Sequence, residues 1–101
     1  MALVHGRSMH PTLREGDRLL VLHAGAPRSG RLAVVRFADG VVAVKRLGHH
    51  DVSGWWVERD NPREGRDSWS GGAIADADVL ATVLLRLWPR PGCLPRRAPA
   101  E

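Results

Sequence analysis

The chain has little cysteine and no long apolar run. Its single cysteine, Cys93, cannot form an internal disulfide, so nothing in the sequence requires an oxidising compartment. The longest apolar stretch, VLATVLL at 79–85, is much shorter than the ~18 residues of a membrane-spanning helix. The opening residues MALVH have neither the basic region nor the apolar region of a signal peptide. We therefore expect a cytoplasmic protein with no stable membrane anchor in this chain.

Lysine is also scarce, because Lys45 is the only lysine among the 15 basic residues. Arginine stays protonated in proteins and cannot act as a base, whereas a lysine can do so once its pKa is lowered. The preference for arginine elsewhere in the chain therefore singles out Lys45 as a candidate base.

Length, apolar content and charge limit the class of protein. The chain has 101 residues, of which 44% are hydrophobic, so one folded domain is expected. The net charge of +4 could attract an anionic partner, but the basic residues are scattered singly. They cluster only near the C-terminus, at Arg90, Arg96 and Arg97. We therefore expect no nucleic-acid partner.

Short apolar segments separated by turn residues predict a small all-β domain with a coiled, barrel-like sheet. The expected strands are 18–23, 31–37, 41–47 and 54–58, and 79–88 fits either a strand or a short helix. Ala38-Asp39-Gly40 reads as a tight hairpin turn, whereas 1–17 and 60–72 read as loops. The predicted domain covers residues 1–89, and 90–101 are expected to form a mobile Pro/Arg-rich tail.

The stretch GRSMHPTL at 6–13 places Ser8 among turn residues and raises the question of a nucleophile. A serine hydroxyl is a poor nucleophile until a base takes its proton. His5 and His10 are close in sequence, but neighbours in one turn often point apart, and no orienting carboxylate is evident. Lys45 follows the apolar run VVAV, where burial would disfavour its charged form. Both kinds of base remain open at this point.

Three segments together resemble the type I signal peptidase family. SMHPTLREGD at 8–17 is similar to the family's nucleophile box, VVAVKRL at 41–47 to its lysine box, and DNPREGRDSWSGG at 60–72 to its last box. The resemblance covers nearly everything from Gly6 to Pro89. It implies a coiled all-β core and a serine endopeptidase with no cofactor and a protein or peptide substrate. It makes Ser8 the nucleophile and Lys45 the general base.

The resemblance also implies supporting residues. The main-chain N–H of Ser8, beside Met9, would contribute to an oxyanion hole. Residues near Met9 and the 32–36 strand are expected to form walls of the substrate site. The supporting residues of the last two boxes are Arg46, Asp60, Asp67 and Ser68.

The chain departs from the family pattern at several positions. Gly-Asp-Asn appears as Arg59-Asp60-Asn61, and Asp-Ser-Arg appears as Asp67-Ser68-Trp69. Gly65 stands where the family often has a serine, and Gly6 where many members have a hydroxyl donor. Because the last arginine is missing, we hypothesise that Arg46 pairs with Asp67 or Asp60 instead. A further alternative is an inactive family member marked by Arg59 and Trp69.

The narrower resemblance is to the proteases that mature nickel-type superoxide dismutase. Ordinary signal peptidases carry membrane anchors before the nucleophile box, whereas seven residues precede Ser8 here, so a soluble form is expected. GWWV at 54–57 and VLLRLWP at 83–89 also resemble these proteases. The implied reaction is removal of an N-terminal propeptide from the superoxide dismutase precursor. The alternative within the same class is a signal-peptidase-like protease acting on another signal peptide or propeptide.

A different class of function is a non-catalytic basic β-domain that binds single-stranded nucleic acid by stacking on tryptophan. Trp55 and Trp56 point to opposite faces of a strand, so at most one of them forms an exposed platform there. Core packing is the expected role for most of the four tryptophans. The five histidines match no zinc spacing, so no metal is expected.

Overall fold

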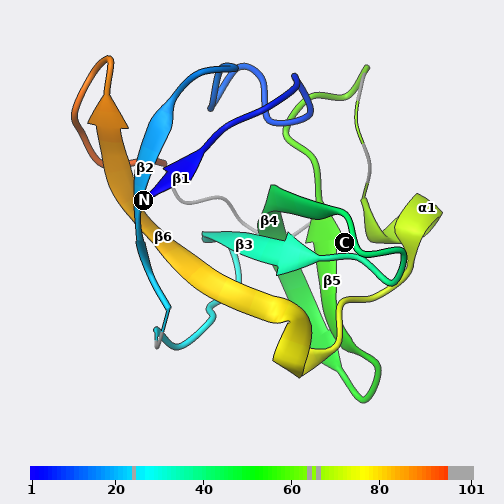
Figure 1. The fold of residues 1–101 in the computed structure, drawn as a ribbon. Coiled ribbons are helices and arrows are strands. Elements are labelled where there is room, and N and C mark those ends of the chain that lie inside the picture. The colour runs from blue at the N-terminus through cyan, green and yellow to red at the C-terminus, as the bar shows by residue number, and fades with distance from the viewer. Residues whose placement is uncertain (24, 64, 66, 96–101) are drawn as a thin grey trace.

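The protein is described by a computed structural model over residues 1–23, 25–63, 65 and 67–95. Its main element is a six-stranded antiparallel sheet in the order β1-β2-β6-β3-β4-β5 (Figure 1). The strands are β1 (Ala2–Leu3), β2 (Arg18–Leu22), β3 (Leu32–Arg36), β4 (Val42–Asp51), β5 (Gly54–Glu58) and β6 (Val79–Trp88). The helical elements are α1 (Ser68–Gly71) and a 3₁₀ turn at Asp76–Asp78. The predicted all-β fold is confirmed.

The strand β6 joins the two halves of the sheet. It pairs with β2 along one edge and with β3 along the other, and Figure 1 shows it as a long curved ribbon between them. Register shifts interrupt both pairings, and extra residues of this kind increase the local twist of a sheet. Of the two predictions for 79–88, the strand is therefore the correct one.

Two strands differ from the sequence prediction. Residues 1–17 were expected to form a loop, but Ala2 and Leu3 pair with β2 as the edge strand β1. The strand β4 continues beyond residue 47 to Asp51, because its last residues pair with the start of β5. The turn between β4 and β5 consequently lies at 52–53. The predicted hairpin turn at 38–40 is present, with Gly40 at a φ of 89°, which favours glycine.

The core is aliphatic and lies in two clusters. The first consists of Val4, Met9, Leu13, Leu19, Leu32 and Val83, and the second of Ala33, Val35, Phe37, Leu47, Val57 and Ile74. Met9 and Leu13 come from the loop between β1 and β2, and both are almost fully buried. Their burial anchors the Ser8 loop to the sheet.

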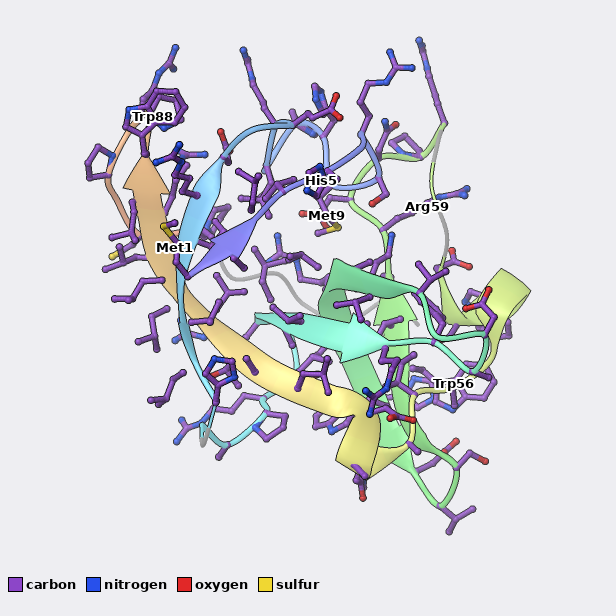
Figure 2. All side chains as sticks on the ribbon, viewed as in Figure 1. Met1, His5, Met9, Trp56, Arg59 and Trp88 are labelled. Atoms are coloured by element: carbon purple, nitrogen blue, oxygen red, sulfur yellow. The ribbon has the colours of Figure 1, made fainter. Side chains whose placement is uncertain are left out.

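Of the four tryptophans, Trp55 packs against the second core cluster, but most of the four lie outside the core, which corrects the sequence expectation. Trp69 is 79% exposed and Trp88 is 55% exposed, while Trp55 and Trp56 are half-buried. The two neighbours on β5 contact different histidines: Trp56 stacks on His49, whereas the ring of Trp55 is tilted against that of His50. Valine, leucine and one phenylalanine fill the interior instead, and Figure 2 shows Trp56 and Trp88 at opposite sides of the molecule.

Among the residues that the structure describes, no helix is long and apolar enough to cross a membrane.

Candidate active site

The side chains of Ser8 and Lys45 meet between the β1–β2 loop and β4. The Nζ of Lys45 lies 2.8 Å from the Oγ of Ser8, which is hydrogen-bond distance. Lys45 is 2% exposed, so water has almost no access to its side chain. Burial disfavours a charged ammonium relative to a neutral amine, and only the neutral amine can accept a proton.

The position of Lys45 follows from the register of the sheet. In the β3–β4 pairing Lys45 lies opposite Ala33, and Arg46 lies opposite Leu32. Successive strand residues point to opposite faces, so Lys45 faces Ser8 while Arg46 points into the other side of the sheet. The small side chain of Ala33, which is fully buried, leaves room beside the lysine.

The histidine alternative for the base is not supported by the geometry. Within the described part of the chain, no hydrogen bond joins His5 or His10 to the Ser8 hydroxyl, and Lys45 is the base that reaches it. The His10 main chain instead closes a turn by donating its N–H to the Arg7 carbonyl at 3.1 Å.

Asn61 fixes the main chain on both sides of the Ser8 α-carbon. Its N–H donates to the Ser8 carbonyl at 2.8 Å, and its side-chain Nδ2 donates to the Arg7 carbonyl at 2.8 Å. Sequence reasoning did not place Asn61 among the candidate site residues. Its position in the segment Arg59-Asp60-Asn61, which resembles a family box, was the signal that could have identified it.

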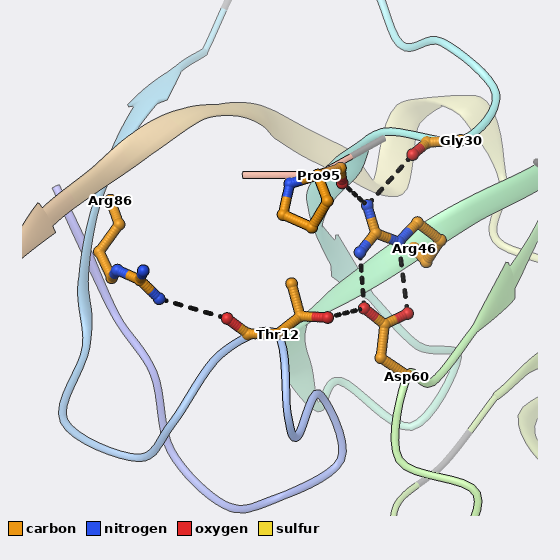
Figure 3. Close-up of polar contacts among 6 residues, drawn as sticks. All are labelled: Thr12, Gly30, Arg46, Asp60, Arg86 and Pro95. Atoms are coloured by element: carbon orange, nitrogen blue, oxygen red, sulfur yellow. Dashed lines mark hydrogen bonds and ion pairs between the residues drawn. The ribbon is translucent and has the colours of Figure 1, made fainter. Parts of the chain in front are cut away.

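Arg46 and Asp60 form a buried ion pair behind the site (Figure 3). The Nη2 of Arg46 lies 2.6 Å from Oδ2 of Asp60, and both side chains are 1% exposed. The same Oδ2 accepts a hydrogen bond from the Thr12 hydroxyl at 2.6 Å. The strand that carries Lys45 is thereby tied to the loop that carries Ser8. Of the two pairings hypothesised for Arg46, the one with Asp60 forms.

The remaining donor of Arg46 is held by main-chain carbonyls. Its Nη1 donates to Gly30 at 3.1 Å and to Pro95 at 2.6 Å, as Figure 3 shows. Leu94 packs against the first core cluster. Leu94 and Pro95, which lie in the predicted tail, therefore contact the folded domain, while 96–101 lie outside the described residues.

Asp67 and Ser68 hold α1 against β5. The Ser68 hydroxyl is buried and accepts a hydrogen bond from the Val57 N–H at 2.7 Å. The Asp67 carboxylate accepts one from the Trp69 N–H at 3.1 Å, at the start of α1. These contacts fix the end of the 60–72 loop.

Two clefts open beside Ser8. The larger, of about 370 Å³, lies between β1 and the β3–β4 hairpin, and Met9, Val34 and Val44 are among its walls. The smaller, of about 250 Å³, is lined by Lys45, Phe37 and Gly65 among others. Met9 and the 32–36 strand therefore border the site, as the sequence predicts. Because both clefts include Ser8, a chain lying across the serine would occupy both.

Comparison with known families agrees with this arrangement. The sequence profile of the family described as Peptidase S24-like matches residues 1–83, a range that contains Ser8, Lys45 and the whole 60–72 loop. The chain belongs to the peptidase S24-like family. This family lies in the group of serine peptidases of the LexA and signal peptidase type, and the match names no narrower subfamily. No curated protein and no solved structure matches the chain significantly.

Proposed function

We propose that the chain is a serine endopeptidase in which Ser8 attacks a peptide carbonyl and Lys45 takes the proton of Ser8. The observation that carries this proposal is the 2.8 Å separation of Lys45 Nζ and Ser8 Oγ, with the lysine almost completely buried. Membership of a serine peptidase family supports it.

The reaction follows the general course of acyl transfer. As the bond from Ser8 Oγ to the carbonyl carbon forms, the neutral amine of Lys45 accepts the hydroxyl proton. The resulting ammonium then gives this proton to the leaving nitrogen as the peptide bond breaks, which leaves an acyl ester on Ser8. A water molecule then gives a proton to the same amine as it attacks the ester carbonyl, and the ammonium returns this proton to Ser8 Oγ as the ester bond breaks, which restores both residues.

Main-chain donors beside Ser8 are suited to stabilising the oxyanion. In the described part of the chain, the N–H groups of Ser8 and Met9 donate to no acceptor, whereas those of His10 and Leu13 in the same turn donate to the Arg7 and Met9 carbonyls. Fixed N–H groups aimed at a developing negative charge stabilise the tetrahedral intermediate strongly. Asn61 holds the turn in place through the Ser8 carbonyl.

We also propose that the substrate is an N-terminal propeptide, that of a nickel-type superoxide dismutase precursor, and that the reaction occurs in the cytoplasm. The segments GWWV and VLLRLWP, which resemble the maturation proteases, lie in β5 and along the end of β6. An extended peptide that spans both clefts would gain main-chain hydrogen bonds and place its side chains in shallow pockets. The alternative substrate is another signal peptide or propeptide.

Co-expression with a nickel superoxide dismutase precursor tests both parts of this proposal. The mass of the intact precursor should fall by that of its propeptide with the wild type, and stay unchanged with Ser8→Ala and with Lys45→Ala. Cleavage by either variant would contradict the mechanism. If the wild type leaves this precursor intact, a fluorophosphonate probe that still labels Ser8 would show that the substrate, and not the chemistry, is wrong.

One observation favours the alternative of a nucleic-acid-binding domain. His49 stacks on Trp56 with ring centroids 5.7 Å apart, Trp69 contacts Trp56 at a tilt with centroids 5.4 Å apart, and Trp69 is largely exposed. The exposed ring of such an aromatic cluster offers a face on which unpaired bases can stack. Titration with a single-stranded oligonucleotide would support this role if Trp69→Ala weakened binding and added salt weakened it steeply.

A further inference from the structure

The side chain of Arg59 holds the loop that follows it. Its Nη1 donates to the Gly65 carbonyl at 2.8 Å, and its Nη2 donates to the Pro62 carbonyl at 3.3 Å. Arg59 comes directly after β5, and Figure 2 shows it on the same side of the molecule as Met9 of the Ser8 loop. One guanidinium therefore holds the main-chain carbonyls of both Pro62 and Gly65.

This loop places the Gly65 main chain directly against the nucleophile. A Cβ built on Gly65 would lie 2.1 Å from the Cβ of Ser8 and 2.7 Å from its Cα, which is far closer than real side chains approach. Gly65 also has a φ of 108°, a conformation that favours glycine. The family's usual serine does not fit at this position, and the glycine main chain forms a wall against Ser8.

Arg59 and Gly65, which both depart from the family pattern, are therefore joined by a hydrogen bond. We propose that Arg59 is a positioning residue for Ser8. By holding the Gly65 carbonyl, it keeps the glycine main chain against the Ser8 side chain, whose hydroxyl then stays directed at Lys45. The proposal depends on the proposed function only in taking Ser8 as the nucleophile.

Arginine is well suited to this role. Its planar guanidinium presents several donors in a fixed fork, so two carbonyls can be held by one side chain. Lysine has the same charge, but its single ammonium group lies at the end of a more flexible side chain and does not present several donors in a fixed plane. Small displacements of a reacting group are costly, since about 1 Å can change a rate about 10²-fold. A loosened loop should thus reduce the reactivity of Ser8 more than it reduces stability.

The test measures labelling of Ser8 by a fluorophosphonate probe. In this reaction the Ser8 oxygen forms a bond to phosphorus, the phosphorus–fluorine bond breaks, fluoride leaves, and the hydroxyl proton passes to Lys45. We expect Arg59→Ala to label about tenfold more slowly than wild type and Arg59→Lys to be intermediate. Across a pH series, the maximal labelling rate of Arg59→Ala should be lower than that of the wild type. The pH of half-maximal labelling should be the same for both proteins, because the base itself is unchanged.

Arg63→Ala is the matched control in the same loop. The hydrogen bond from Arg63 to the Asn61 side chain is made by its main-chain N–H, which alanine keeps. This variant should label at the wild-type rate. Wild-type labelling by Arg59→Ala, or an equal loss in Arg63→Ala, would overturn the proposal.

Hydrogen exchange separates this proposal from the proposed function. The Asn61 N–H, which bonds to the Ser8 carbonyl, should exchange faster in Arg59→Ala than in wild type. If the probe fails to label even the wild type, the proposed nucleophile is wrong, and exchange still decides whether Arg59 holds the loop. Unchanged exchange in Arg59→Ala would contradict the positioning role.

Discussion

Arg46 and Asp60 form a buried ion pair, with 2.6 Å between Nη2 and Oδ2 and both side chains 1% exposed. One partner follows Lys45 directly in β4, and the other also accepts a hydrogen bond from Thr12 in the Ser8 loop. The pair therefore connects the two segments that bring Ser8 and Lys45 together.

Removing one partner of this pair should destabilise the fold strongly. Asp60→Ala leaves the Arg46 guanidinium buried without its carboxylate, and the loss of one buried partner typically costs about 3–5 kcal/mol. Urea unfolding should show this loss. Asp78→Ala is the control, because the Arg36–Asp78 pair is partly exposed and such pairs contribute about 0–1 kcal/mol. Equal losses in the two variants would contradict the account.

The segment 93–95 should also stabilise the domain through Arg46. A chain that ends at Gly92 lacks the Pro95 carbonyl, which accepts from Arg46 Nη1 at 2.6 Å, and lacks the packing of Leu94 on the core. A hydrogen bond to a charged group contributes about 1.5–3 kcal/mol, so we expect a loss of that order. The comparison is with a chain that ends at Arg96, so that Pro95 keeps its peptide carbonyl. Equal urea midpoints for the two chains would show that the contact contributes nothing.

Gly65 should not tolerate a β-carbon. Gly65→Ala would bring its Cβ against that of Ser8, so Ser8 labelling should fall at least tenfold. Gly72→Ala is the matched control, because Gly72 also has a positive φ, of 84°, but a Cβ there would meet nothing within 4 Å. Both variants place an alanine at a positive φ and therefore strain the backbone. Only in Gly65→Ala does the new Cβ also collide with Ser8. Similar labelling rates in the two variants would mean that Gly65 does not contact the nucleophile as described.

The hairpin between β4 and β5 should weaken in acid. Hydrogen bonds from the Ser53 N–H and then from the Trp56 indole lower the pKa of Asp51 below its ordinary value. A carboxyl whose pKa is lower in the folded state stabilises the fold above its unfolded pKa of about 3.9, and this contribution is lost as the pH falls through the folded value. Because Asp51 is exposed, the effect should be small.

Asp51→Asn isolates that contribution from the other carboxylates. Urea midpoints measured from pH 7 down to pH 2 should fall slightly less for the variant than for the wild type. Identical pH dependence for the two proteins would show that the Asp51 hydrogen bonds do not contribute to stability.

Much of the sheet could be predicted because its strands carry short apolar runs bounded by turn residues. The 38–40 turn and the strands at 18–22 and 54–58 follow from that pattern. The strand β1 could not be predicted, since two residues are too few for a periodic signal, and it exists only because β2 offers an edge. The length of β4 was underestimated because His49 and His50 are not typical strand residues, although pairing with β5 holds them.

The site was partly visible in the sequence for a different reason. Ser8 and Lys45 could be singled out by residue type and by resemblance, and the structure brings them together. The contributions of Pro95 and Arg59 could not be foreseen, because each involves main-chain carbonyls that carry no residue-specific signal. Asn61 could have been identified only through its place in the family-like box. Long-range contacts of this kind depend on the folded path of the chain.

The central claim is that Lys45 activates Ser8, and a comparison of wild type with Lys45→Met tests it most directly. Methionine retains a long apolar side chain in the buried position but removes the base. With a fluorophosphonate probe, the intact mass of the wild type should increase by one label, located at Ser8, while folded Lys45→Met stays unlabelled over the same time. Labelling of Lys45→Met at the wild-type rate would contradict the account.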